Sequence, residues 1–316
     1  MNARARRLVK LFLRVIVSLG LLFWLLHRVD PGKILASFRT IAPTVWLSAF
    51  VLYLISQVLS SIRWFVLARA LGFAGRLITY LKFYFVGMFF NLFLPSAIGG
   101  DVLKAFFLSR GGNSKLRATY TIFFDRLMGL WAMFVLGACA AAFAPDVLPW
   151  KLRMLLFAVT VTMSLVLVFM PVFQKLINFL LPVFSRRLSS LLIYWQKPSS
   201  LAYAFTISLM LQFCGMYAVY LMAKGLGLSC RPEFYFAAFP MVAILTILPI
   251  SLSGLGIREG GFVYFLGLKG VAPEKAITLS LGFFAVQAAA ALLGGAGYLA
   301  GIHRETIGCS AGEKRD

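Results

Sequence analysis

The chain has 316 residues, of which 61% are hydrophobic and 13% are charged. A soluble domain is closer to half apolar and a quarter charged, so this composition excludes an ordinary soluble enzyme. The formal net charge is +21, but the basic residues lie mostly between apolar runs, where the positive-inside rule and anionic lipid headgroups account for them. We expect no nucleic-acid partner, because the sequence has no RNA- or DNA-binding motif.

The first predicted element is a helix at residues 11–28. Basic residues precede it, as they do in a signal peptide. However, Arg14 interrupts the apolar run, which continues to Leu26, and no small-x-small cleavage site follows. We therefore predict that residues 1–28 form a retained N-terminal helix that begins in the cytoplasm.

Six apolar segments are long enough to cross the hydrocarbon core of a bilayer; in chain order they are residues 11–28, 43–67, 118–143, 152–171, 200–223 and 275–301. Two further apolar segments, 79–110 and 233–268, are each interrupted by proline and glycine. The sequence thus predicts an all-α fold. We expect a polytopic membrane helical bundle with about six spanning helices and two broken re-entrant hairpins, six to eight helices in all.

The two broken segments belong to blocks that resemble each other. The string ARALGF at 68–73 matches AKGLGL at 223–228, 155 positions later, and Pro95 matches Pro249 at almost the same offset. We interpret this as an internal duplication, with chance similarity of membrane segments as the alternative. Within one membrane domain, 1–316, we predict a first repeat, a linker, a second repeat and a polar tail; their bounds are 43–143, 144–199, 200–303 and 304–316.

Basic residues predict the orientation of these repeats. If each broken block returns to its own side, the basic segments 69–82, 104–117 and 172–198 all face the cytoplasm, as the positive-inside rule favours. The repeats are then inverted, with both termini in the cytoplasm and the chain in the cytoplasmic (inner) membrane. Residues 185–197 have an apolar face typical of a helix lying in the membrane interface, although a solvated loop would also fit.

Three acidic residues lie inside the apolar blocks: Asp101, Asp125 and Glu259. Charges at bilayer depth are costly, so they usually face a cavity or a partner. Asp101 and Lys104 can meet, because residues three apart share a helical face. Neighbouring residues point about 100° apart, so Asp125 and Arg126 need separate partners. We expect a charge network across helices, either lining a binding site or serving only as buried ion pairs.

The two breaks suggest a site for an anion. Ser96 and Ser253 are candidate N-caps of short helices, whose free N–H groups and positive dipole ends attract negative groups. Arg258 could add a bidentate contact to phosphate. We therefore predict a membrane lipid with a phosphate-containing or anionic headgroup as the ligand. The predicted substrate-binding residues are Asn91, Ser96, Gly99, Gly100, Asp101, Lys104, Asp125, Arg126, Ser253, Gly254, Gly256, Arg258 and Glu259.

No catalytic motif is evident. GxSxG, HExxH and P-loop strings are missing, and Gly254-x-Gly256 follows no predicted strand, so it is no dinucleotide fingerprint. The four cysteines form no CxxC pair or Cys/His cluster. We accordingly expect no metal, no other cofactor and no enzymatic activity.

Three strings resemble the hallmarks of one membrane family, the lysylphosphatidylglycerol synthase transmembrane region, also described as flippase-like. They are NLFLPSAIGGD at 91–101, DRLMG at 125–129 and PISLSGLGIRE at 249–259. The resemblance extends over residues 10 to 300 and implies a prokaryotic inner-membrane protein that moves lipids. In the multiple peptide resistance factor a similar region precedes a soluble aminoacyl-transfer domain. Because this chain ends at Asp316, we expect neither that domain nor its synthase activity.

The sequence therefore predicts a lipid flippase or lipid transporter with a site between the two broken helices at the membrane midplane. Two alternatives stay open. The first is an intramembrane lipid or polyprenyl-sugar transferase. The second is a non-transporting partner of a lipid-synthesis enzyme.

Overall fold

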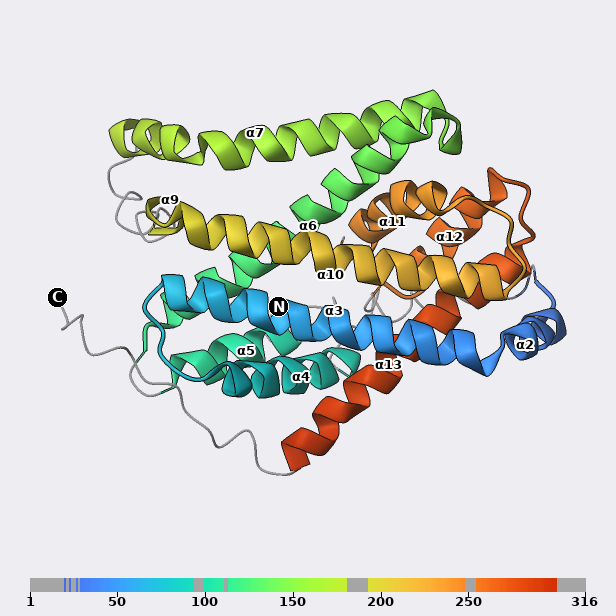
Figure 1. Cartoon of the computed structure of the whole chain (residues 1–316), viewed down its shortest axis with the longest axis horizontal. Helices are drawn as coiled ribbons and strands as arrows, with labels where there is room; N and C mark the ends of the chain where they lie inside the picture. The colour runs from blue at the N-terminus through green and yellow to red at the C-terminus, as the bar shows by residue number, and fades with distance from the viewer. Residues whose placement is uncertain are drawn as a thin grey trace, which may run out of the picture.

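The computed structural model describes residues 29–93, 99–110, 113–180, 193–247 and 254–299, together with Gly20, Phe23 and His27. Throughout this part of the chain the regular structure is helical, and no β-strand forms. The helices, shown in Figure 1, are α2 (Pro31–Thr40), α3 (Pro43–Ala70), α4 (Leu77–Phe93), α5 (Gly99–Ser109), α6 (Lys115–Phe143), η1 (Pro145–Val147), α7 (Trp150–Leu180), α9 (Ile193–Gln196), α10 (Pro198–Gly225), α11 (Pro232–Ile247), α12 (Ile257–Gly267) and α13 (Pro273–Leu299).

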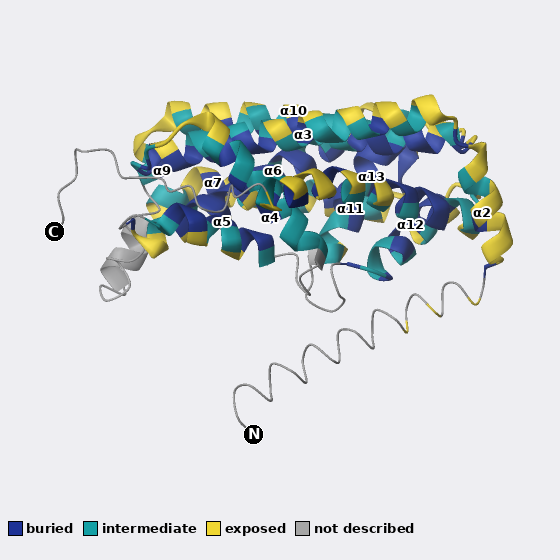
Figure 2. Ribbon diagram, turned by 90° about the horizontal axis from the view of Figure 1, so that it is seen from below, coloured by how far each residue is buried: buried dark blue, intermediate teal, exposed yellow. Residues whose placement is uncertain are grey.

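Five of the described helices, α3, α6, α7, α10 and α13, are long and apolar enough to cross a membrane. Their outward faces carry large exposed hydrophobic side chains, such as Val161 and Val168 on α7. The buried residues gather where the helices face one another (Figure 2). The prediction of an all-α polytopic membrane bundle is confirmed. The sixth predicted span, 11–28, lies outside the described residues except at Gly20, Phe23 and His27.

The succession of helices repeats. The series α3, α4, α5, α6 is followed by α10, α11, α12, α13, and α3 and α10 each have 28 residues beginning with proline. Both end in the same turn: the Phe73 N–H donates to the Ala68 carbonyl at 3.1 Å, and the Leu228 N–H donates to the Ala223 carbonyl at 3.0 Å. Gly72 and Gly227 supply the positive φ that such a helix end requires, at 87° and 69°.

The two series run in opposite directions. Helices α3 and α10 lie side by side over their whole length (Figure 1). The Lys197 ammonium, at the start of α10, donates to the carbonyl of Ala70 at the end of α3, whereas Gly225 at the end of α10 packs near Val45 at the start of α3. The second helix of each series also packs on the last helix of the other series: α4 packs on α13, and α11 packs on α6. This is the arrangement expected of an inverted repeat.

Each broken block turns back on itself. Helix α5 packs along α4, where Phe83 stacks on Phe107 with ring centroids 4.9 Å apart. A Cβ on Gly100 would collide with the backbone of Gly87, so two glycines allow the closest approach within this hairpin. Helix α12 likewise returns along α11. With 11 residues each, α5 and α12 are about 16 Å long and too short to span a bilayer.

The interruptions themselves, residues 94–98 and 248–253, lie outside the described part of the chain. So does most of the predicted interfacial helix at 185–197. Its described portion is the single turn α9, where the Tyr194 side chain is buried and its hydroxyl donates to the Leu67 carbonyl at 3.2 Å. At this residue the segment is anchored to the end of α3.

Candidate functional site

The first charged cluster centres on Asp101, in the first turn of α5. One carboxylate oxygen lies 2.8 Å from the ammonium of Lys104, and the other accepts a hydrogen bond of 2.7 Å from Nε of Arg126 on α6. Lys104 is itself buried, with its ammonium 4.3 Å from the centroid of the Tyr84 ring. One carboxylate is therefore held by two cations from two helices, which leaves the cluster with a surplus positive charge.

Arg126 differs from its partners in being accessible. Its side chain is 56% exposed, whereas those of Asp101 and Lys104 are 6% and 3% exposed. It lies 11 residues after the first residue of the spanning helix α6, which is about 17 Å along the helix axis. A guanidinium at this depth that is both paired and accessible can exchange its contact with Asp101 for a contact with a ligand.

The second cluster is closed. The Arg63 guanidinium on α3 donates from Nε to Asp125 on α6 at 2.7 Å and from Nη1 to the Ser208 hydroxyl on α10 at 3.0 Å. The Arg63 and Asp125 side chains are 5% and 1% exposed. A Cβ on Gly129 would lie 2.8 Å from Nη1 of Arg63, so this glycine makes room for the guanidinium. The contacts join α3, α6 and α10 and have the character of a structural ion pair.

Asp125 and Arg126 therefore bind different partners, as their 100° separation predicts. The partners come from different elements: Asp125 is paired across the bundle with α3, and Arg126 is paired with the short helix α5. The predicted network across helices is thus present. One of the two neighbouring residues belongs to the closed cluster, and the other to the accessible one.

The third cluster lies at the start of α12. Oε1 of the fully buried Glu259 accepts from Nη2 of Arg258 at 2.7 Å and from the Ser280 hydroxyl on α13 at 2.9 Å. The Arg258 side chain is 13% exposed, and its guanidinium carbon lies 4.8 Å above the ring of Phe284. This pair is neutral and largely enclosed, so Arg258 is much less accessible than Arg126.

The N-terminal ends of the two short helices are partly occupied by the protein's own groups. The Gly100 N–H donates to the Asn91 side-chain oxygen at 2.7 Å, and the Gly256 N–H donates to Oε2 of Glu259 at 2.6 Å. These two N–H groups are therefore already bound within the protein. Ser96 and Ser253, the predicted caps, lie outside the described residues.

The glycines of the two breaks have separate roles. Gly254 and Gly256 have φ of 78° and 82°, a conformation that favours glycine, so they shape the turn into α12. Gly100 permits the close approach to Gly87, and Gly99 begins α5 beside it. These features account for Gly100, Gly254 and Gly256 without a ligand.

Several residues at these clusters were missing from the predicted set. They are Arg63, Tyr84, Ser208 and Ser280. Of these four residues, only Arg63 could have been found from the sequence, because it is a charged residue within an apolar helix. Serine and tyrosine are common in membrane helices, so their contacts with Arg63, Arg258 and Lys104 became evident only from the packing of helices distant in sequence.

Comparison with known proteins agrees with this architecture. The model of the family described as lysylphosphatidylglycerol synthase TM region matches residues 11–295. The chain belongs to this family. It is also similar to a UPF0104 membrane protein of Methanocaldococcus jannaschii, with 26% identity over an alignment of 202 residues that covers 58% of this chain and 81% of the relative. The family match includes all three charged clusters and both hairpins, and it places the chain among multi-pass membrane proteins.

Proposed function

We propose that this member of the family is a lipid flippase or lipid transporter of the cytoplasmic membrane, and that Arg126 binds a phosphate-containing or anionic headgroup. The observation that carries the proposal is the accessible guanidinium of Arg126 beside buried Asp101. Guanidinium is permanently charged, and its planar fork matches the geometry of a phosphate. Both termini are proposed to lie in the cytoplasm.

The chemistry of the cluster supports binding followed by release. When Arg126 turns toward a headgroup, Asp101 keeps the Lys104 ammonium at 2.8 Å and is not left as an unpaired buried charge. When the headgroup leaves, Asp101 offers Arg126 its original partner again. An exchange of one anionic partner for another avoids the large cost of stranding a charge at membrane depth.

This assignment moves the headgroup contact from Arg258 to Arg126. Arg258 is enclosed and neutralised by Glu259, so taking up a second anion there would require opening a buried pair. Arg126 needs no such opening, because more than half of its side chain is already exposed. Within the described interior, the surplus positive charge is also at Arg126 rather than at Arg258.

A reconstituted assay tests the proposal. Purified protein is placed in liposomes with a headgroup-bearing fluorescent phospholipid, and the fraction accessible to an impermeant quencher is followed. We expect wild-type protein to relocate the lipid, Arg126→Gln to slow relocation at least tenfold, and Arg39→Gln, which removes an exposed cation on α2, to have no effect. Equal rates for wild type and Arg126→Gln would reject the assignment of Arg126.

The same liposomes distinguish transport from the two alternatives. Mass spectrometry of the recovered lipid should find it chemically unchanged; a modified lipid would favour the transferase. A protein that neither moves nor modifies phospholipids alone, but does so after a co-purifying lipid-synthesis enzyme is added, would favour the partner role.

A further inference from the structure

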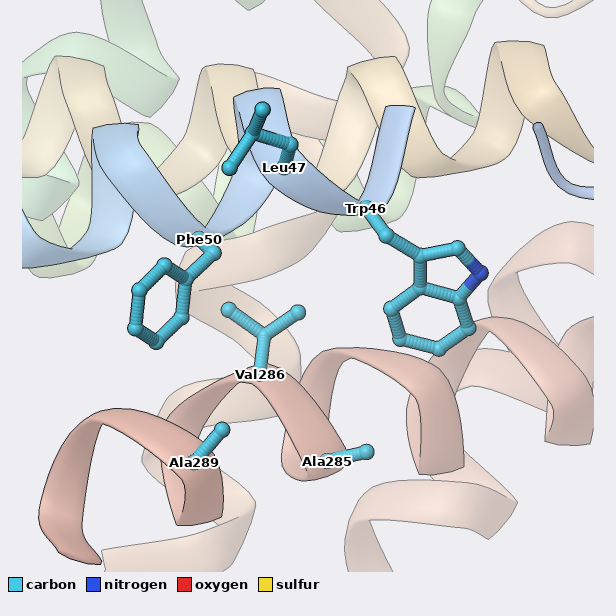
Figure 3. A pocket seen from close by; sticks show the side chains of 6 residues that line it. All are labelled: Trp46, Leu47, Phe50, Ala285, Val286 and Ala289. Atoms are coloured by element: carbon cyan, nitrogen blue, oxygen red, sulfur yellow. The ribbon is translucent and has the colours of Figure 1, made fainter. Parts of the chain in front are cut away.

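An apolar groove of about 450 Å³ lies between α3 and α13, outside the charged clusters. Figure 3 shows its lining, which consists of Trp46, Leu47 and Phe50 from α3 and Ala285, Val286 and Ala289 from α13. It is open toward the outside of the bundle, and Leu47 in its wall is 63% exposed.

The inverted repeat supplies a counterpart. Phe50 on α3 corresponds to Phe205 on α10, 155 positions later, and Ala289 on α13 corresponds to Trp131 on α6, 158 positions earlier. At the seam of α6 and α10, Trp131 fills the space, with its ring centroid 4.0 Å from that of Phe205. The groove between α3 and α13 therefore lies where the second repeat has Ala289 and the first repeat has the much larger Trp131.

The counterpart seam is also covered by a further helix. Nε1 of Trp131 donates to the Ser164 hydroxyl on α7 at 2.9 Å, and one turn further along α6 the Phe134 carbonyl accepts from the Thr160 hydroxyl on α7. Phe134 is fully buried, but Leu292 at the corresponding position of α13 is 55% exposed. In the described part of the chain α13 has no equivalent of α7.

Chain order identifies the missing cover. Helix α7 precedes α10 and packs on α6, the last helix of the opposite repeat. The segment at residues 11–28 precedes α3 in the same way, with only the short helix α2 between them. We infer that residues 11–28 lie antiparallel along α13 and fill the groove lined by Ala285, Val286 and Ala289, as α7 does on α6.

The connection to α2 fixes where this segment must end. Val29 is buried with Ile34 and Ile277, so the chain meets α13 at Ile277. The groove residue Ala289 lies 12 positions further along α13, about 18 Å by helical rise. An antiparallel helix ending at Val29 covers that distance by about Val17, well within residues 11–28.

Cysteine crosslinking in native membranes tests this inference. The background lacks Cys139, Cys214, Cys230 and Cys309. Ala289→Cys is combined in turn with single cysteines at residues 14 to 20, and an oxidant forms disulfides between neighbours. We expect a crosslink within the chain that peaks near Val17→Cys. The pair Val45→Cys and Gly225→Cys, which are in contact in the structure, is the positive control, and Ala289→Cys with Val161→Cys on the outer face of α7 is the negative one.

Two results would overturn the inference. One is a positive control that crosslinks while no cysteine from 14 to 20 reacts with Ala289→Cys. The other concerns the rate at which Ala289→Cys reacts with a lipid-soluble thiol reagent. If this rate is the same in the full chain as in a variant that also carries Val17→Asp and Leu21→Asp, the groove is filled by lipid and not by residues 11–28. Neither readout requires transport, so the inference stands or fails apart from the proposed function.

Discussion

Asp101 and Glu259 occupy the same place in the two repeats, yet they take their arginines from different helices. Each is the third residue of the short second helix of its hairpin. Asp101 is held by Arg126 from the following long helix, whereas Glu259 is held by its own neighbour, Arg258. The position equivalent to Arg126 is Phe284, and its ring lies beneath the Arg258 guanidinium. A similar cation–carboxylate pair is thus built twice by different means.

This relationship predicts a rescue. Arg258→Gly leaves the buried carboxylate of Glu259 without its cation, and we expect a loss of about 3–5 kcal/mol in the free energy of unfolding. Adding Phe284→Arg rebuilds the arrangement of the first repeat and should recover a large part of the loss. Thermal unfolding in detergent measures both variants. No recovery in the double variant would show that the two pairs are not equivalent.

Substitutions at Arg126 should show whether headgroup binding needs only a positive charge or also the geometry of the guanidinium. Arg126→Lys keeps a positive charge but loses the bidentate fork, so we expect an intermediate rate of phospholipid relocation between wild type and Arg126→Gln. A labelled neutral glycolipid, which has no phosphate, should respond equally weakly to both substitutions. If the lysine variant transports phospholipid as well as wild type, charge alone suffices and the bidentate contact is unnecessary.

Lys104 should support transport without touching the lipid. Lys104→Met leaves Arg126 as the cation of Asp101 in this cluster, which should hold the guanidinium in place and weaken headgroup exchange. We expect slower relocation and, because a buried partner is lost, a lower unfolding temperature. The double variant Lys104→Met with Asp101→Asn should regain thermal stability but not transport. Normal transport in the single variant would separate Lys104 from the exchange.

The Arg63–Asp125 pair should be structural. Asp125→Asn or Arg63→Met alone is expected to cost about 3–5 kcal/mol of stability, since each strands a buried charge. Arg63→Met combined with Asp125→Leu should cost much less, because apolar groups then replace both charges. A double-mutant cycle on unfolding temperatures checks this. Additive losses would argue against a direct pairing.

Orientation follows from the hairpin. The start of α4 and the end of α5 lie at one end of the bundle, with basic residues and no acidic ones in segments 69–82 and 109–117. The positive-inside rule therefore predicts that this end faces the cytoplasm. Lys115→Cys in a cysteine-free background should therefore react with an impermeant thiol reagent only after the membrane is opened. Reaction in intact cells would reverse the proposed orientation.

Much of the fold could be predicted because membrane-spanning helices can be recognised in a sequence by their length and apolar composition. The duplication was visible in the turn after Ala68 and its copy after Ala223, where a helix end needs glycine. The site was harder to predict. Sequence spacing could pair Asp101 with Lys104, but it could not show that Arg258 is enclosed and Arg126 accessible, because exposure depends on helices brought together from distant parts of the chain.

The difference between the two hairpins has an energetic consequence. A transporter built from inverted repeats reaches its opposite opening when the repeats exchange shapes, and identical repeats would make inward and outward openings equal in free energy. Here the carboxylate of the first hairpin is ion-paired with Arg126 on a neighbouring long helix, whereas the carboxylate of the second is ion-paired with its own neighbour Arg258 and contacts the long helix α13 through the neutral Ser280 hydroxyl. Moving the first hairpin strains an interhelical ion pair, whereas moving the second carries its arginine along and breaks only neutral contacts with α13. We therefore expect the empty protein to rest with the Asp101 hairpin docked on α6 and to leave that state when a headgroup takes over Arg126.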